Sequence, residues 1–176
     1  MSRLATVWRH WLPFAVMGLA LVLLINITLQ QSYRQAANDP QIQLAEDAVN
    51  AINAGALPES QVSNQPVNIS ESLDTVLIVT NLKGVILASS ARIGTDLPIP
   101  PLGSLTNGHR FTWQPQSGVR MAAVVVRYSA DGSGYVIASR NIREVEQRED
   151  NLNLVTAIDF LGLLVGVFIV LVLVNE

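Results

Sequence analysis

The sequence predicts an α+β domain placed between two membrane-spanning helices. Three patterns lead to this fold class. A long apolar run lies near each end of the chain, a segment with helical spacing follows the first run, and five short β-rich runs separated by glycine-containing turns come next. This order favours a long helix packed on one face of a five-stranded, mostly antiparallel sheet.

Composition narrows the kind of domain and its partners. The chain has 176 residues, 49% of them hydrophobic and only 14% charged, because two apolar runs shift the average. The remaining segment of about 120 residues suffices for one buried core and is too short for two domains. The net charge of −3 and the scattered arginines, with Lys83 the only lysine, argue against a nucleic-acid partner. The absence of cysteine excludes disulfides, thiolate metal sites and cysteine nucleophiles.

The first apolar run, residues 11–29, predicts a transmembrane helix. Trp8 and Trp11 stand where an aromatic belt at the membrane interface is expected, and Arg3 and Arg9 precede the run. A cleavable signal peptide has the same order of charge and apolar residues. No small-x-small cleavage site follows the run, however, which favours an uncleaved anchor.

The last apolar run, residues 154–174, predicts a second transmembrane helix. At a rise of about 1.5 Å per residue it reaches the roughly 30 Å of a bilayer's hydrocarbon core. By the positive-inside rule, residues 1–10 stay in the cytoplasm, residues 30–153 form an extracytoplasmic domain and residues 175–176 return to the cytoplasm. We therefore expect a protein of the cell membrane, inner or plasma, with two spans.

Residues 30–54 predict a long outer helix. Its apolar stripe is made of residues spaced three to four apart, namely Ile42, Ala45, Val49 and Ile52. Pro40 interrupts the pattern, but a polar residue before it can cap a restarting helix, so we expect a kink or a cap and not the end of the element. Gly55 ends the helix, and residues 56–72, rich in Pro, Ser, Asn and Gln, are predicted to be linker.

The sheet is predicted from five runs. Residues 75–80 and 85–90 flank a short polar turn with Gly84 and predict a hairpin. Residues 91–108, with three prolines and three glycines, predict an irregular crossing segment with one short helical turn. Three further strands are predicted at residues 110–114, 120–128 and 135–140, separated by turns at Gln116-Ser-Gly118 and Asp131-Gly-Ser-Gly134.

From Asn141 the chain returns to a helical pattern. Glu144 stands four residues before Arg148, which predicts a supporting ion pair on the helix surface. Neither glycine nor proline lies between Asn141 and Asp159. The last strand is therefore expected to be coupled to the second apolar run by a helix with no break.

Three segments resemble a known family. Residues 35–47, QAANDPQIQLAED, look like the first outer helix of the extracytoplasmic sensor region of bacterial membrane histidine kinases, of PAS-like or single-Cache type. Residues 76–89, VLIVTNLKGVILAS, look like the opening hairpin of that region, and residues 134–148, GYVIASRNIREVEQR, like its closing strand and exit helix. The resemblance covers nearly the whole chain and implies a PAS-like five-stranded antiparallel sheet between two transmembrane helices.

The resemblance implies a signal-sensing module of the two-component type. A small anionic ligand bound by the outer domain would change the relation between the two helices that lead to the spans, and the family implies a homodimer. In the family, the second span is followed by a dimerisation helix with a phosphorylated histidine and by an ATP-binding domain. Here the sequence stops at Glu176, and neither His10 nor His109 can take that role. We expect a sensor with no catalytic domain that signals to a separate kinase or other membrane protein, or else a truncated kinase fragment.

A candidate ligand-binding surface comprises His109, Arg110, Trp113, Arg120 and Tyr135. Mixed polar and aromatic residues line many pockets, and the guanidinium groups of strand arginines such as Arg120, Arg127 and Arg140 suit carboxylates and phosphates. The alternative is that Asn107-Gly-His is an exposed turn and Trp113 a core aromatic. The arginines would then be solvated and paired with glutamates of the exit helix.

The sequence gives little support for catalysis. Ser89, Ser90, Asp96 and His109 include the residue types of a hydrolytic triad, but no G-x-S-x-G surrounds either serine. The turn at Asp131 offers one carboxylate, too few oxygens for a calcium loop. We expect neither an enzyme nor a bound metal or cofactor.

Three residues of the second apolar run are candidates for packing within the membrane. Asp159 is an ionisable residue that either faces a partner or water inside the membrane, or lies at the outer interface at small cost. Gly162 and Gly166 form a G-x-x-x-G pattern that permits close approach of two helices, although the pattern also arises by chance.

A second class of function remains open at this point, namely a two-span scaffold whose outer domain docks another envelope protein and binds no ligand. A fully packed sheet face would favour the scaffold. A pocket lined by Trp113, Arg120 and Tyr135 would favour sensing.

Overall fold

The computed structural model describes residues 3–130 and 132–174, with side chains described for 7–32, 39–130 and 132–174. The ends of the predicted cytoplasmic segments and the first residue of the last predicted turn, namely Met1, Ser2, Asp131, Asn175 and Glu176, lie outside the described residues, as does the side chain of Arg3. The chain divides into a helical unit, Met1–Arg34 with Glu146–Glu176, and a sheet unit, Gln35–Val145.

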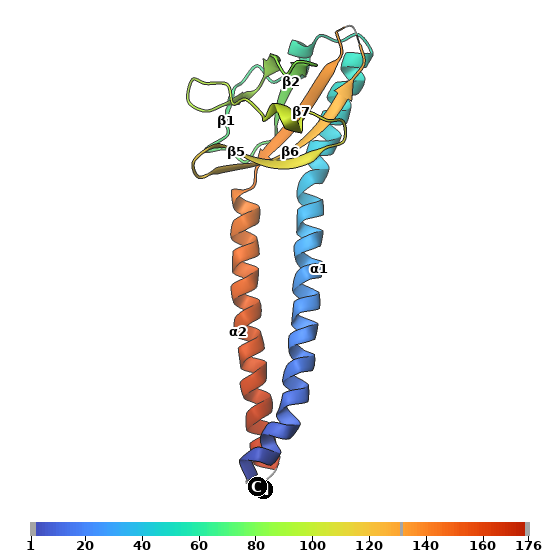
Figure 1. The fold of residues 1–176 in the computed structure, drawn as a ribbon. Helices are drawn as coiled ribbons and strands as arrows, with labels where there is room; N and C mark the ends of the chain where they lie inside the picture. Colours follow the sequence, from blue (N-terminus) through green and yellow to red (C-terminus); the bar gives the residue numbers. More distant parts are fainter. Residues whose placement is uncertain (1–2, 131, 175–176) are drawn as a thin grey trace. The chain divides into compact units, whose positions relative to one another are not determined.

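Two long helices and a mixed central region make up the chain (Figure 1). The helices are α1 (Arg3–Asn53) and α2 (Arg143–Val174), and two short 3-10 turns are η1 (Pro58–Gln61) and η2 (Leu102–Ser104). The strands are β1 (Val67–Asn68), β2 (Val76–Asn81), β3 (Ile86–Ser89), β4 (Ala91–Arg92), β5 (Arg110–Gln116), β6 (Val119–Tyr128) and β7 (Gly134–Asn141).

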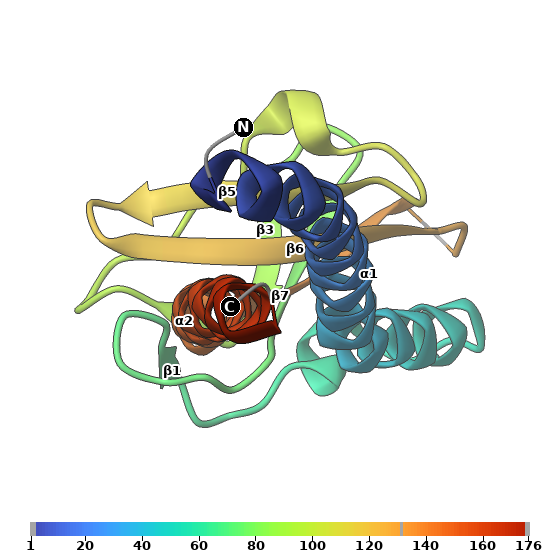
Figure 2. The same cartoon turned by 90° about the horizontal axis from the view of Figure 1, so that it is seen from below.

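Five strands form one sheet in the order β3-β2-β7-β6-β5, with every neighbouring pair antiparallel. The predicted α+β class, with a five-stranded antiparallel sheet and a long N-terminal helix, is therefore confirmed. The long strands β5 and β6 run side by side (Figure 2). Pro115 lies in β5, which is an edge strand, and there its missing N–H costs no ladder hydrogen bond.

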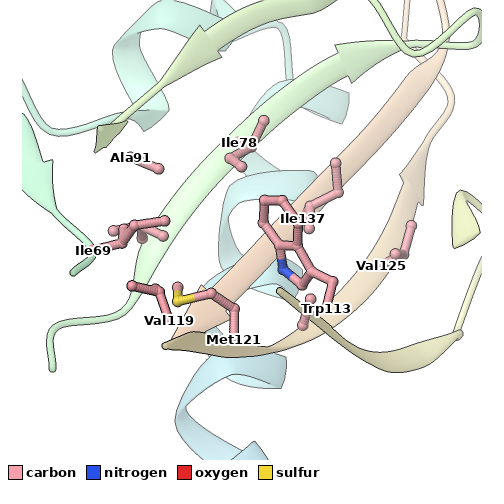
Figure 3. Close-up of a cluster of buried hydrophobic side chains, with 10 residues drawn as sticks. Ile69, Ile78, Ala91, Trp113, Val119, Met121, Val125 and Ile137 are labelled. Carbon is pink, nitrogen blue, oxygen red and sulfur yellow. The ribbon is translucent and has the colours of Figure 1, made fainter. Parts of the chain in front are cut away.

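Two separate clusters of buried side chains cover the two faces of the sheet. On the first face, which we call the helix-covered face, Ala45, Ala48, Val49 and Ile52 of α1 pack against residues of β2, β6 and β7 (Figure 1). On the second face, which we call the loop-covered face, Ile69 and Ala91 pack on residues of β2, β5, β6 and β7 (Figure 3). The partly buried Ile93 and Leu105 also pack against this cluster. Both faces are therefore buried, one by a helix and the other by loops.

The helix α1 continues past Pro40 and ends as the sequence predicts. Gly55 has a φ of +99°, its N–H donates to Ile52 O at 2.9 Å, and Ala56 N donates to Ala51 O at 3.0 Å. This is the Schellman arrangement, which places a glycine just beyond the helix end. Asn53 Oδ1 also accepts hydrogen bonds from Ser129 N and Ala130 N, so the end of α1 is fixed to the end of β6.

The predicted hairpin is formed by β2 and β3. Asn81 Oδ1 accepts from Lys83 N at 2.9 Å and from Val85 N at 3.0 Å, while Gly84 has a φ of +79°. A side chain at Gly84 would also collide with Leu102 of the crossing segment. The turn therefore requires glycine for its backbone conformation, whereas the leucine side chain could move aside.

The linker prediction for residues 56–72 is wrong in part, because the segment contains η1 and β1. Residues Val67 and Asn68 pair in parallel with Ala91 and Arg92 of β4, and Ile69 is only 1% exposed. Two-residue strands leave no periodic pattern in a sequence, so tertiary packing alone reveals them. Residues 56–72 thus supply part of the cover of the loop-covered face.

In the helical unit, α1 and α2 contact each other through polar and aromatic side chains. Asn26 Nδ2 and Gln30 Nε2 both donate to Asn153 Oδ1, at 3.1 and 3.2 Å. Farther along, Trp11 Nε1 donates to Leu164 O at 3.0 Å. Among the described residues, Val7–Ser32 and Arg143–Val174 are each long and apolar enough to cross a bilayer.

Candidate functional site

Trp113, predicted to line a ligand pocket, belongs to the core. It is 8% exposed and packs with Met121 and Ile137 on the loop-covered face (Figure 3). Its Nε1 donates to Ser139 Oγ at 3.4 Å, and that hydroxyl donates to Ala122 O at 3.1 Å. The alternative interpretation, a core aromatic, is the one that the structure bears out.

The arginines of the predicted surface lie on the other face. Arg110 is the cross-strand partner of Val124, and Arg120 lies two residues before Ala122 on the same strand. Because side chains alternate along a strand, both arginines share the helix-covered face with these even-numbered residues of β6. The predicted pocket of Trp113, Arg120 and Tyr135 is therefore not formed, because the sheet separates the arginine from the two aromatics.

The structure instead brings three other residues together on the loop-covered face. Arg127 and Tyr135 are direct cross-strand partners on β6 and β7. Val125 N donates to His109 O at 3.0 Å, so His109 lies beside Val125, which is two residues before Arg127 on β6. Since Phe111 and Tyr135 both pack against the core of this face, His109, Arg127 and Tyr135 point to the same side of the sheet.

The imidazole of His109 is held by its neighbours. Its Nδ1 lies 3.0 Å from Ser104 O, and its ring stacks on Phe111 with a centroid distance of 5.6 Å and an interplanar angle of 16°. A carbonyl oxygen only accepts hydrogen bonds, so Nδ1 carries the proton of this contact. The ring is exposed although it is oriented, as a ligand-binding group requires.

The loop before β5 also positions Arg127. Asn107 Oδ1 accepts a hydrogen bond from Arg127 N at 3.0 Å, and Gly108, with a φ of +73°, allows the turn that brings Asn107 there. The side chain of Arg127 is exposed, and that of Tyr135 is half-buried beside it. A guanidinium, an imidazole and a phenol on the same face of neighbouring strands suit the recognition of a carboxylate or a phosphate.

A second group of residues joins the loop-covered face to the start of α2. Asn141, 3% exposed, donates from Nδ2 to Ile69 O at 2.8 Å and accepts at Oδ1 from Arg143 N at 2.9 Å. Arg140 Nε donates to Leu73 O at 2.9 Å. We call Asn141 with its partners Ile69 and Arg143 the α2 junction. Sequence reasoning missed it, although an asparagine just before a helix is a recognisable capping signal.

A buried tyrosine, Tyr128, lies on the helix-covered face at the end of β6. The hydroxyl of Tyr128 donates to Thr80 O at 3.1 Å, and burial raises the pKa of Tyr128 above its usual value of 10.0. A side chain at Gly134 would collide with Thr80 O and with the ring of Tyr128. The three residues therefore form a tight structural contact and leave no room for a ligand.

The candidate packing residues of the second apolar run do not contact α1. Nothing lies within 4 Å of the position that a Cβ would take on Gly162 or Gly166, and Asp159 is exposed. Close approach of the two helices occurs instead at Gly18, where a Cβ would lie 3.5 Å from Phe160 Cε2 and 3.7 Å from Leu163 Cδ2. Gly18 was not singled out by the sequence reasoning.

Within the described residues, no group of three or more His, Cys, Asp or Glu side chains has the arrangement of a metal site. Comparison of the chain with protein-family models, with curated proteins and with solved structures gives no match. The argument for function therefore rests on the sequence and on the geometry of the site.

Proposed function

We propose that the protein is a membrane-anchored, extracytoplasmic signal-sensing module of the two-component type, with a PAS-like sheet unit. In this proposal the chain crosses the cell membrane with Val7–Ser32 and with the apolar part of α2, and both termini are cytoplasmic. The exposed apolar side chains of both segments support the two spans. Arg9, and Arg3 before it in the sequence, support the orientation.

The observation that carries the proposal is the α2 junction. Asn141 is bonded on one side to Ile69, which covers the sheet, and on the other to the first N–H of α2. A ligand that shifts the loop cover therefore acts on the same side chain that fixes the start of the helix. Such a shared contact lets binding energy bias two arrangements of α2.

The ligand in this proposal is a small anion bound by His109, Arg127 and Tyr135. The cover residues Ser104 and Asn107 fix His109 and Arg127 through hydrogen bonds, so binding there acts on the crossing segment of residues 91–108. That segment begins with β4, which pairs with β1 next to Ile69. One route from ligand to helix therefore runs through the loop cover, and a second runs along β7, which carries Tyr135 and leads to Asn141.

Thermal-shift measurements on the full chain in detergent test ligand binding. Succinate, citrate and inorganic phosphate serve as probes. A ligand at 100 times its Kd stabilises the fold by about 2.7 kcal/mol, so a Tm increase of several degrees is expected for at least one of them. Arg127→Leu abolishes the shift, whereas Arg110→Leu, an exposed arginine on the opposite face, keeps it. Equal shifts in the two variants would place the anion elsewhere.

Chemical labelling tests the topology independently. Lys83 is the only lysine and its side chain is exposed in the β2–β3 turn. A membrane-impermeant amine reagent applied to intact cells should modify Lys83, and Lys83→Arg should remove the label. Labelling that requires permeabilised cells would locate the sheet unit in the cytosol and contradict the proposal.

A second candidate, the two-span docking protein without a small ligand, is favoured by one observation. Trp113 fills the face on which a pocket was predicted, and the loop cover packs directly on the core. The same screen separates the candidates, because a docking protein shows no Tm increase with any of the three anions. That result would replace the sensing proposal with the docking function.

A further inference from the structure

Asp159 lies well inside the apolar stretch of α2. Its position along the helix pair follows from the contacts with α1. Phe160, the next residue, lies within contact distance of the Cβ position of Gly18. Asp159 is six residues beyond Asn153, which bonds Asn26, and nine before Phe168, which packs on Trp8 and Trp11. At 1.5 Å per residue these separations are about 9 Å and about 13 Å along the helix.

The side chain of Asp159 lies on an exposed side of α2. Positions 159, 162 and 166 are spaced three and four apart and so share one side of the helix. All three are exposed, and the Cβ positions of Gly162 and Gly166 have no neighbour within 4 Å. We call this side, Asp159 with Gly162 and Gly166, the aspartate face. Among the residues that the structure describes, no hydrogen bond or ion pair reaches the carboxyl group of Asp159.

The inference that follows rests on the proposed function, in which a bilayer surrounds the helical unit. The polar cluster at Asn153 then lies toward the outer interface and the aromatic cluster at Phe168 toward the inner one, and Asp159 lies between them. Its side chain is too short to reach water in the way that lysine and arginine do. An ionisable group at that depth, directed at lipid, is costly and calls for a partner.

We propose that the aspartate face binds a transmembrane helix of another protein that carries a lysine or arginine at the same depth. A carboxylate in an apolar medium is compensated best by a cation. Gly162 and Gly166 allow the backbone of the partner helix to come close, which shortens the distance between the two charges.

A second copy of this chain supplies no such cation. Across residues 11–32 and 154–174 the only charged residue is Asp159. Self-association through the aspartate face would bring two carboxyl groups together, with no positive charge within either apolar run to offset them. Charge complementarity therefore selects a different protein as the partner and a basic residue as its recognition feature.

The test uses the full chain in phosphatidylcholine vesicles and a synthetic helix as the partner. The chain has no cysteine, so Gln147→Cys provides a single labelling site for a fluorescent donor. The acceptor-labelled peptides are two Leu/Ala transmembrane helices, one with a central lysine and one with leucine there. We expect energy transfer to show roughly tenfold stronger association with the lysine peptide. Asp159→Leu should remove this preference and Asp159→Glu should keep it.

Two further variants separate charge from packing. Gly162→Leu should weaken the association with the lysine peptide, because it blocks close approach on the aspartate face. Leu161→Phe, an apolar enlargement at an exposed position on another side of the helix, should leave the association unchanged. A chain that resists alkaline carbonate extraction from the vesicles, but binds both peptides equally, would overturn the inference and leave the proposed function standing.

Two other results have distinct meanings. Energy transfer between two labelled copies of the chain that is lost in Asp159→Leu would overturn the inference in favour of a second copy on the aspartate face. Release of the chain by carbonate extraction would show that it does not span the bilayer. That outcome would remove the proposed membrane function and this inference with it.

Discussion

The two faces of the sheet are both buried, but they are covered in different ways. On the helix-covered face, the apolar stripe of α1 packs on the strands, and Asn53 fixes the end of the helix to β6. On the loop-covered face, the cover consists of irregular segments held by single hydrogen bonds such as Ile69 N to Arg92 O at 3.0 Å. A continuous helix closes the first face, and separate loop contacts close the second.

This difference assigns different roles to the two faces. A cover made of separate loop segments can open locally, one segment at a time, at a lower free energy than a continuous packed helix. The loop-covered face also carries His109, Arg127 and the α2 junction, so the more easily moved cover lies between the proposed ligand and the exit helix. The helix-covered face would then serve as the fixed support against which the loop cover moves.

The largest expected effect is loss of the side chain that fills the loop-covered face. Trp113→Ala removes a buried aromatic and should cost about 3–5 kcal/mol, because the surrounding strands cannot close the cavity. Thermal unfolding of the full chain in detergent, followed by circular dichroism, should show a Tm lowered by roughly 15 °C or more. Trp113→Phe keeps most of the volume and should cost much less. A small effect of Trp113→Ala would mean that this face is not closed as described.

The next effect concerns the helix-covered face. Gly134→Ala places a methyl group against Thr80 O and the Tyr128 ring, so β7 or the tyrosine must shift. Overpacking of this kind should lower the free energy of unfolding by about 2–3 kcal/mol. Gly103→Ala, where nothing lies within 4 Å of the added Cβ, is the matched control and should change stability little. Equal Tm values for the two variants would contradict the tight contact at Gly134.

Features of the fold that depend on neighbouring residues were easier to predict from the sequence than those that depend on strand register. The hairpin, the three later strands and the end of α1 were predictable, because β-branched runs, glycine turns and Gly55 act locally. The assignment of strand residues to faces was predicted less well. The predicted pocket placed Arg120 beside Trp113. Met121 is the cross-strand partner of Trp113, and because side chains alternate along β6, the neighbouring Arg120 points to the other face of the sheet. The irregularity between Trp113 and Gln116 makes this register hard to count from sequence.

Other features depend on contacts between distant parts of the chain. The pairing of β1 with β4 joins two residues to two others more than twenty positions away, and neither segment has a strand pattern of its own. The grouping of His109 with Arg127 follows from the β5–β6 ladder and from the Asn107 contact. Asn141 was recognised only as a helix start, because its bond to Ile69 spans 72 positions.

A change at the α2 junction should have an intermediate effect on stability and a specific effect on the loop cover. Asn141→Ala removes the donor to Ile69 O and the acceptor for Arg143 N, which should cost about 2 kcal/mol. Asn141→Asp keeps the acceptor at the start of α2 but places a carboxylate oxygen against Ile69 O, so its effect should be larger at residues 67–73 than at the start of α2. Hydrogen exchange of the full chain measures both regions. Unchanged exchange at residues 67–73 in both variants would rule out the junction as the link between cover and helix.

The smallest expected effect tests the helix-covered face through pH. Tyr128→Phe loses one hydrogen bond to Thr80 O and should cost about 1 kcal/mol at neutral pH. Because burial raises the pKa of Tyr128 in the folded chain above the unfolded value of 10.0, the stability linked to its proton is complete below pH 10 and is lost as the pH rises through the folded pKa. The variant lacks this titration, so the difference in Tm between it and the wild type should shrink above pH 10. A difference that stays constant up to pH 11 would mean that the Tyr128 hydroxyl is in contact with water, and that the helix-covered face is no more tightly closed than the loop-covered one.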